Sequence, residues 1–138
     1  MKAPLFRILL TLIGCVSMQN RKTDEYILKI ERANCFGKSP TYRFEVFSNQ
    51  TLLYEGMKKV TRIGKGTLQI NSNRFRELKK QIEGLPFSAY EDQYGRTIRD
   101  ISYIMVTLNN KRVKMTLSQG PEELMQLVRM VEEEFQLL

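Results

Sequence analysis

The sequence predicts an α+β domain with a mainly antiparallel sheet of about five or six strands and two helices on one face. Three observations predict this class. Segments in which apolar and polar residues alternate outnumber segments with helical periodicity. Successive strands have short connections, which favours antiparallel pairing. The chain has 138 residues, 42% of them hydrophobic, which suits one small domain.

The N-terminal half of the domain contains the first strand segments. Alternation predicts strands over residues 26–31 and 42–47. Residues 48–50, Ser-Asn-Gln, are expected to turn the chain into a third strand. A further strand pair is expected across residues 58–70, with the Gly-Lys-Gly of residues 64–66 as its bend, because glycines often punctuate strands.

The first helix is expected over residues 72–83. Ser72 can cap its N-terminus, and Gly84 marks its end. Apolar residues recur at three- and four-residue spacing and would face the core: Phe75, Leu78, Ile82 and Leu85.

An irregular stretch around residues 90–100 leads to a predicted hairpin. Residues 103–108 and 111–117 alternate again, and Asn109-Asn110 suits a tight turn because asparagine tolerates positive φ. Pro121 opens a final helix that is expected to run to Leu138. Its core-facing residues would be Leu124, Leu127, Val128, Val131, Phe135 and Leu138.

The N-terminal segment has the layout of an export signal. A basic start precedes an apolar run, and Leu12-Ile13-Gly14-Cys15 resembles the bacterial lipobox, in which the cysteine after the cleavage site carries the lipid. We therefore expect a signal peptide over residues 1–14, lipid attachment at Cys15, a tether over residues 15–23 and one domain over residues 24–138. The alternative is an ordinary N-terminal strand or secretory signal with a coincidental cysteine.

A lipid anchor implies a location in the bacterial cell envelope. The apolar stretch over residues 8–18 is shorter than the roughly 20 residues that span a bilayer. Val16 follows the cysteine where inner-membrane retention in enteric bacteria uses Asp, which favours the outer membrane in a Gram-negative host. The membrane is then a partner through the anchor.

The charge balance is basic, with 22 Lys and Arg against 15 Asp and Glu. Loss of Lys2 and Arg7 with the signal leaves 20 − 15 = +5. Because an exported lipoprotein meets no chromosome, this charge predicts no nucleic-acid partner. The basic run over residues 58–65 is interpreted as the solvated face of an edge strand, with contact to anionic lipid as the alternative.

The composition excludes many kinds of catalytic site. The chain has no histidine, which removes Ser-His-Asp and Cys-His catalysis and the common zinc motifs. Glu91, Asp92 and Asp100 lack EF-hand spacing and are interpreted as part of an ion-paired loop with Arg96 and Arg99. Residues 64–67 are too short for a phosphate-binding loop. We predict no catalytic residue, metal site or cofactor.

Residues 35–42 read Cys-Phe-Gly-Lys-Ser-Pro-Thr-Tyr and lie between the first two strands. They resemble the Cys-Phe-Gly-x-Cys-Pro-x-Tyr pattern of domain of unknown function 6438, a bacterial family often found behind lipoprotein signals. The resemblance covers nearly all of residues 25–138 and implies no activity. Ser39 stands where the family commonly has a second cysteine, so Cys35 is interpreted as a buried structural residue. A speculative binding segment comprises Phe36, Gly37, Lys38, Ser39 and Pro40.

Two functions remain at this point. The favoured one is a non-enzymatic envelope lipoprotein that binds an envelope protein or a cell-wall component through the uncovered sheet face or the segment over residues 35–42. The alternative is a small envelope hydrolase or thiol-redox protein. A deep pocket with two carboxylates, or an exposed Cys35 beside a lysine, would favour the alternative.

Overall fold

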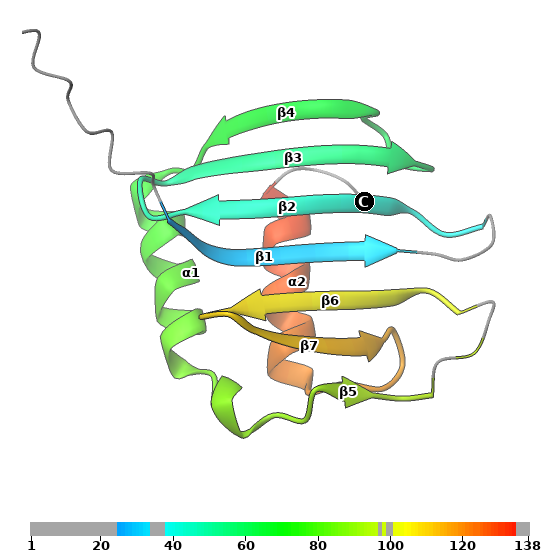
Figure 1. Ribbon diagram of the computed structural model, residues 1–138. Helices are drawn as coiled ribbons and strands as arrows, with labels where there is room; N and C mark the ends of the chain where they lie inside the picture. The colour runs from blue at the N-terminus through cyan, green and yellow to red at the C-terminus, as the bar shows by residue number, and fades with distance from the viewer. Residues whose placement is uncertain (1–24, 34–37, 97, 99–100, 135–138) are drawn as a thin grey trace, which may run out of the picture.

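A seven-stranded sheet forms one layer of the protein, and two helices cover one of its faces (Figure 1). This computed structural model describes residues 25–33, 38–96, 98 and 101–134. It confirms the α+β class and the one-sided arrangement of the helices, with slightly more strands than the sequence predicts.

The strand order across the sheet is β4-β3-β2-β1-β6-β7-β5. Every neighbouring pair is antiparallel except β5 with β7, which is parallel. The strands are β1 (Tyr26–Ala33), β2 (Thr41–Phe47), β3 (Thr51–Lys58), β4 (Gly64–Gln69), β5 (Gln93–Tyr94), β6 (Tyr103–Leu108) and β7 (Lys111–Thr116). Strand β1 therefore joins the β2-β3-β4 meander to the C-terminal strands.

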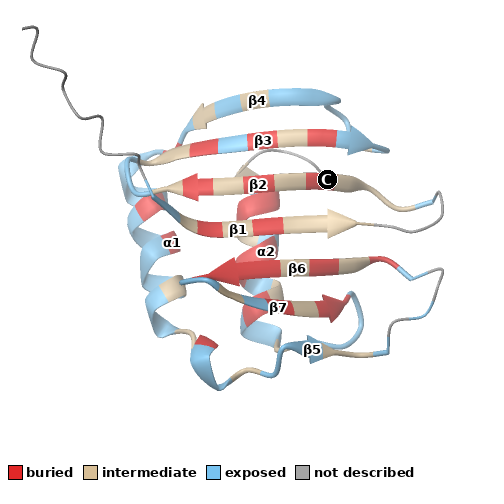
Figure 2. Ribbon diagram, viewed as in Figure 1, coloured by how far each residue is buried: buried red, intermediate tan, exposed pale blue. Residues whose placement is uncertain are grey.

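The core lies between the sheet and the helices α1 (Ser72–Gly84) and α2 (Glu122–Glu134). Buried and less buried residues alternate along the central strands, as Figure 2 shows, because successive side chains point to opposite faces. The opposite face of the sheet has no described element over it, and we call it the open face. Fully enclosed core side chains include Leu28, Ile30, Phe44, Val46, Leu52, Val106, Val113, Leu124 and Leu127.

The start of β1 departs from the predicted alternation. Tyr26 was expected in the inward-facing set with Leu28 and Ile30, yet it is 37% exposed. The register with β2 shifts between Tyr26 and Leu28, so one extra residue is inserted there. Such a bulge moves a side chain off its expected face, which explains the exposure of Tyr26.

The predicted bend at residues 64–66 is wrong, because these residues lie inside β4. Strand β3 continues to Lys58, and residues 59–63 make the turn, with Lys59 at φ 51°. Gly66 pairs with Tyr54 on the inner side of the sheet. Gly66 is therefore a paired residue within a strand and not part of the turn.

The helix boundaries differ slightly from those predicted. Asn71, not Ser72, caps α1, since its side chain accepts a hydrogen bond from the Asn73 N–H at 2.9 Å. In α2 the predicted core positions Leu124, Leu127, Val128 and Val131 are buried. Phe135 and Leu138 lie outside the described residues.

The segment between α1 and β6 holds structure that the sequence did not predict. A 3₁₀ turn spans Phe87–Ala89, and β5 pairs with the far side of β7. The next hairpin is confirmed: Leu108 pairs with Lys111, and Asn109 and Asn110 have φ of 47° and 66°. Both values are positive, as a type I′ turn requires.

Candidate functional site

Several connections emerge at one end of the sheet (Figure 1). The β1–β2, β3–β4, β5–β6 and β7–α2 connections all start from this end, because β1, β3, β5 and β7 run towards it. We call the described parts of these connections, together with the adjoining strand ends, the loop end. The start of β1 lies at the opposite end of the sheet.

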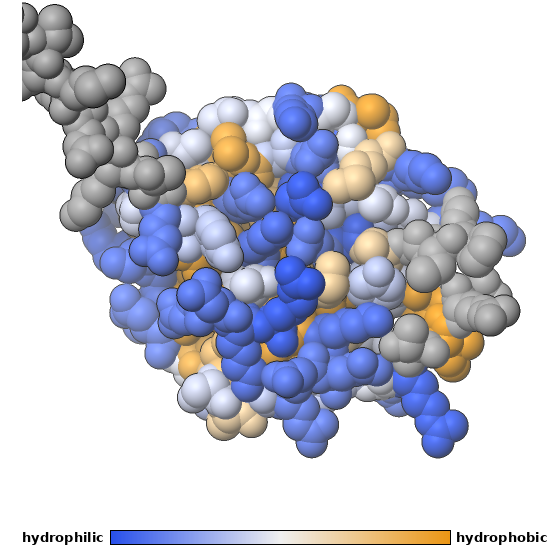
Figure 3. All heavy atoms as spheres, viewed as in Figure 1, coloured by the Kyte–Doolittle hydropathy of each residue, from blue (hydrophilic) through white to orange (hydrophobic). Residues whose placement is uncertain are grey.

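Exposed apolar side chains gather at the loop end. Of the seven large hydrophobic residues that are exposed among the described residues, five belong to it. Figure 3 looks onto the open face and shows hydrophobic patches beside the start of β4 and beside the β5–β6 connection. The two patches are separate, because β3 and β4 lie towards one edge of the sheet and β7 and β5 towards the other; exposed apolar patches on a soluble domain typically mark interaction surfaces. The five residues and their exposed fractions are Met57 41%, Ile63 64%, Ile98 55%, Ile101 39% and Leu117 44%.

Basic side chains also lie at the loop end. Four of the six come from residues 58–65, and all are exposed: Lys38, Lys58, Lys59, Arg62, Lys65 and Arg96. The carboxylates of Glu91 and Asp92 are also exposed near β5. Among the described residues, neither of these carboxylates forms an ion pair with Arg96. The predicted ion-paired loop is therefore not formed by these three residues, while Arg99 and Asp100 lie outside the described part.

A buried tyrosine holds the β3–β4 connection in place. The Tyr54 hydroxyl donates a hydrogen bond to the Arg62 carbonyl at 2.7 Å, and Tyr54 is only 2% exposed. Its hydroxyl passes over Gly56, where a Cβ would lie 2.3 Å from it and 2.1 Å from the Arg62 carbonyl oxygen. The Tyr54-Glu55-Gly56 sequence therefore fixes the loop that presents Ile63, and burial raises the pKa of the Tyr54 hydroxyl.

The predicted binding segment falls only partly within the described residues. Lys38 is exposed, and Ser39 and Pro40 are half-buried where the chain enters β2. Phe36 and Gly37 lie outside the described residues, as do both cysteines, Cys15 and Cys35. Lys38, Ser39 and Pro40 belong to the loop end, so the segment lies at the same end of the sheet as the apolar group.

A set of buried polar groups lies beneath the loop end, on the helix-covered side. Arg32 is the last inward-facing residue of β1, and its guanidinium Nη1 lies 3.7 Å from Glu132 Oε1 on α2. Tyr42 pairs with Arg32 in the sheet, and Ser102 precedes Ile104, the other partner of Arg32. Within the described part of the chain, four buried polar atoms here have no hydrogen-bond partner: Arg32 Nε, the hydroxyls of Tyr42 and Ser102, and Glu132 Oε1.

Burial raises the pKa of Glu132, and the positive charge of Arg32 opposes this only in part. Glu132 is 5% exposed. Sequence reasoning missed this residue because it occupies a polar position in a Glu-rich stretch of the last helix. Its partner lies in the first strand, so no local pattern could have indicated the pair. In the part of the chain that the structure describes, the carboxylate of this cluster is that of Glu132, and Arg32 is its ion-pair partner.

Charged side chains on the open face of the central strands neutralise one another. Lys29 Nζ lies 3.6 Å from carboxylate oxygens of both Glu31 and Glu45. Arg43 contacts Glu31 at 3.0 Å and Glu55 at 3.4 Å. Since the signs alternate, this area offers little net attraction for a charged ligand, and partly exposed pairs of this kind contribute only about 0–1 kcal/mol each. It is a solvated surface.

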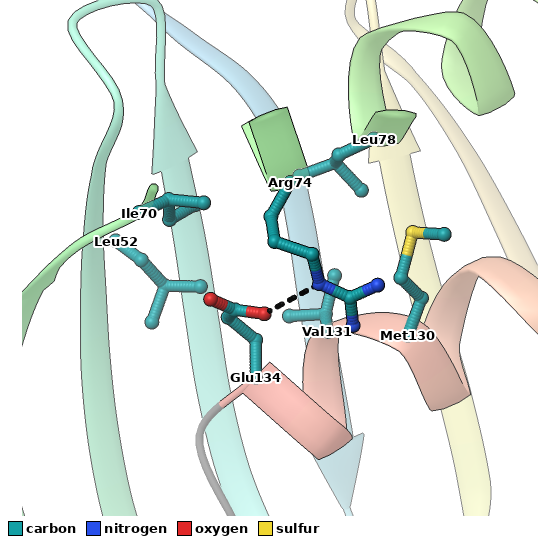
Figure 4. Close-up of a pocket in the computed structure, with 7 residues that line it drawn as sticks. All are labelled: Leu52, Ile70, Arg74, Leu78, Met130, Val131 and Glu134. Carbon is teal, nitrogen blue, oxygen red and sulfur yellow. Dashed lines mark hydrogen bonds and ion pairs between the residues drawn. The ribbon is translucent and has the colours of Figure 1, made fainter. Parts of the chain in front are cut away.

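The hollows among the described residues differ in size and lining. Figure 4 shows a small one between the sheet and the helices, where Arg74 Nε donates to Glu134 at 3.2 Å. Its volume is about 10 Å³, which is room for no more than one water molecule. Two shallower hollows measure about 320 Å³ over β2, β3 and β4 and about 490 Å³ beside α1 and α2. The first contains Glu45 and Glu55, both already paired with cations.

The described residues contain neither a metal-binding cluster nor a membrane-spanning helix. No group of three or more Cys, Asp or Glu residues is placed to hold a metal ion there. None of the helices in the described part of the chain is long and apolar enough to cross a membrane.

The chain thus forms a small α+β domain in which helices cover one face of the sheet. Irregular connections and exposed apolar residues lie at one end of that sheet. The family model described as Domain of unknown function (DUF6438) matches residues 26–135, and the chain belongs to this family. The resemblance noted from the sequence is confirmed. No curated protein matches the chain.

Proposed function

We propose that the chain is a lipid-anchored protein of the bacterial cell envelope whose domain acts by binding, without turnover, and meets its partner through the loop end. The observation that carries this proposal is that five exposed hydrophobic residues, in two patches, lie at the end of the sheet that also bears Lys38, Ser39 and Pro40.

The position of the anchor relative to the loop end supports the proposal. Strand β1 has eight residues and separates the two ends of the sheet by roughly 26 Å, at about 3.3 Å per residue. A lipid on Cys15 would attach to the end where β1 begins. With β1 upright on the membrane, the loop end faces away from the lipid and towards other envelope components.

The chemistry of the loop end favours a protein as the partner over a cell-wall glycan. Of the five exposed apolar residues at the loop end, three are isoleucines, one is leucine and one is methionine. Burying one such side chain against a protein contributes about 1.5–3 kcal/mol, whereas a polar glycan offers little apolar surface in return. The surrounding lysines and arginines would add attraction for carboxylates on the partner.

Photocrosslinking tests the contact in the full-length lipidated protein. A photoreactive amino acid replaces Ile63 or Ile98, and Gln81 on the exposed side of α1 is the control position. We expect a crosslinked protein at positions 63 and 98 that is lost when Leu117→Asp is added, while the melting temperature stays unchanged. Equal capture at position 81, or capture of peptidoglycan alone, would contradict a protein contact at the loop end.

Lipidation is tested separately. Cells that express the chain are labelled with radioactive palmitate, and the wild type is compared with Cys15→Ser. We expect label in the wild type and none in the variant. An unlabelled wild type would remove the anchor from the proposal and leave the loop-end contact to be judged by crosslinking.

A further inference from the structure

The sheet has one long unpaired edge, along β4. This strand runs over Gly64–Gln69 and pairs with β3 on one side, and no other described strand lies on its outer side. The opposite edge strand, β5, has two residues. Edge strands commonly carry a proline, a bulge or strong shielding, because their free N–H and C=O groups can template another strand. Strand β4 has neither a proline nor a register shift with β3, and Lys65 is its one charged residue.

The register shows which backbone groups face outward. Ile70 N–H donates to the Gln50 carbonyl at 2.8 Å, which makes these opposed residues a hydrogen-bonded pair. Bonded and non-bonded pairs alternate along an antiparallel ladder. The N–H and C=O groups of Lys65, Thr67 and Gln69 therefore point away from β3, towards the outer edge.

The open face beside this edge has space for the side chains of an added strand. The hollow of about 320 Å³ is lined by β2, β3 and β4, and includes Leu53, Lys65 and Thr67. Leu53 is 39% exposed. Alternate side chains of a strand added along β4 would lie on this face, so an apolar residue can reach towards Leu53.

The positive charge beside β4 favours some added strands over others. Residues 58–69 contain four cations and no carboxylate. Lys58, Lys59 and Lys65 form no ion pair with any described residue. Two copies of this chain paired edge to edge would bring these cations together, which disfavours a homodimer. A segment rich in Asp and Glu would be attracted instead.

We propose that the outer edge of β4 binds an acidic, extended segment of a partner protein as an additional strand. The backbone groups of Lys65, Thr67 and Gln69 supply the hydrogen bonds, as in strand addition generally. The lysines select the charge of the segment. The edge begins beside Ile63 of the loop end, but the variants differ: Thr67→Pro and Lys65→Glu alter the edge and Leu117→Asp alters the loop end, so the two proposals are tested separately.

The probe is an octapeptide with blocked ends in which Glu and Val alternate, added to the full-length protein. We expect it to bind and to slow hydrogen exchange at the outward N–H groups of Lys65, Thr67 and Gln69. Thr67→Pro removes one of these N–H groups without touching the β3 ladder and should weaken binding about tenfold or more. Thr67→Val keeps the N–H group and should bind like the wild type.

Two further comparisons keep the test decisive if the proline variant does not fold. The same peptide N-methylated at alternate residues, and an octapeptide of Lys and Val, should both bind the wild type at least about tenfold more weakly. Lys65→Glu should reduce binding of the acidic peptide, whereas Lys80→Glu on α1 should not. Equal binding of all peptides, no binding of the acidic one, or a homodimer that Thr67→Pro dissociates would each overturn the proposal.

Discussion

Replacing Gly56 by alanine should destabilise the β3–β4 connection, because the added Cβ would collide with neighbouring atoms. The added Cβ would lie 2.1 Å from the Arg62 carbonyl oxygen and 2.3 Å from the Tyr54 hydroxyl. Neither can yield cheaply, since one is backbone and the other belongs to a ring that is 2% exposed and packs 5.2 Å from the ring of Phe44. The hydrogen bond between Tyr54 and Arg62 must therefore break.

The expected cost follows from these contacts. Forcing extra volume into a packed site costs about 1–3 kcal/mol, and the lost hydrogen bond adds about 0.5–1.5 kcal/mol. Gly56→Ala should thus lower the free energy of unfolding by roughly 2–4 kcal/mol. Tyr54→Phe alone should lower it by about 1 kcal/mol, because water can reach the exposed Arg62 segment.

Urea denaturation of the two single variants and the double variant measures the coupling. The Tyr54→Phe variant already lacks the hydrogen bond to Arg62. The loss of unfolding free energy caused by Gly56→Ala should therefore be smaller in this variant than in the wild type, by about 1 kcal/mol or more. Gly84→Ala is the matched control. It lies at the end of α1 with nothing within 4 Å of the new Cβ, and should be neutral or raise stability by up to about 1 kcal/mol. Additive costs at positions 54 and 56, or equal effects at positions 56 and 84, would refute this reasoning.

Three other outcomes are expected. Burial raises the pKa of Glu132, so the folded protein retains that proton to higher pH than the unfolded chain does; this contribution to stability is complete below the ordinary Glu pKa of about 4.3 and is lost as the pH rises through the folded pKa. Glu132→Gln should flatten that part of the curve of melting temperature against pH, and an unchanged curve would contradict the assignment. Val131→Asp places an unpaired charge in the core and should cost several kcal/mol in denaturant titrations, whereas the exposed Glu133→Lys should stay within about 0.5 kcal/mol. Cys35 should react with iodoacetamide no faster than a free thiol at neutral pH, because the chain has no histidine to activate it; faster modification would favour thiol chemistry.

Elements whose boundaries are set by local chemistry were predictable from the sequence. The hairpin at Asn109 and Asn110 needs two positive φ angles, and asparagine tolerates both. The buried stripe of α2 follows from helical spacing alone. The prediction for residues 64–66 was wrong because two glycines usually indicate a bend, whereas here Gly66 pairs with Tyr54 inside β4.

The features that depend on distant contacts were not predictable in the same way. Strand β5 has two residues and exists because it pairs with β7, about twenty residues later in the chain. The pairing of Arg32 with Glu132 joins the first strand to the last helix. The loop end likewise arises from the strand order, which brings Ile63, Ile98 and Leu117 to the same end of the sheet.

The central place of β1 determines how the domain would respond to mechanical load. A tether that reaches the domain at Tyr26 pulls on a strand that is hydrogen-bonded on both sides, to β2 and to β6. Tension along this strand shears two ladders at once, so many hydrogen bonds share the force instead of opening one after another as they would at an edge strand. Forced unfolding is governed by the rate of crossing that barrier. The topology therefore makes the start of β1 a point at which a pulling force is resisted by ladders on both sides of the strand.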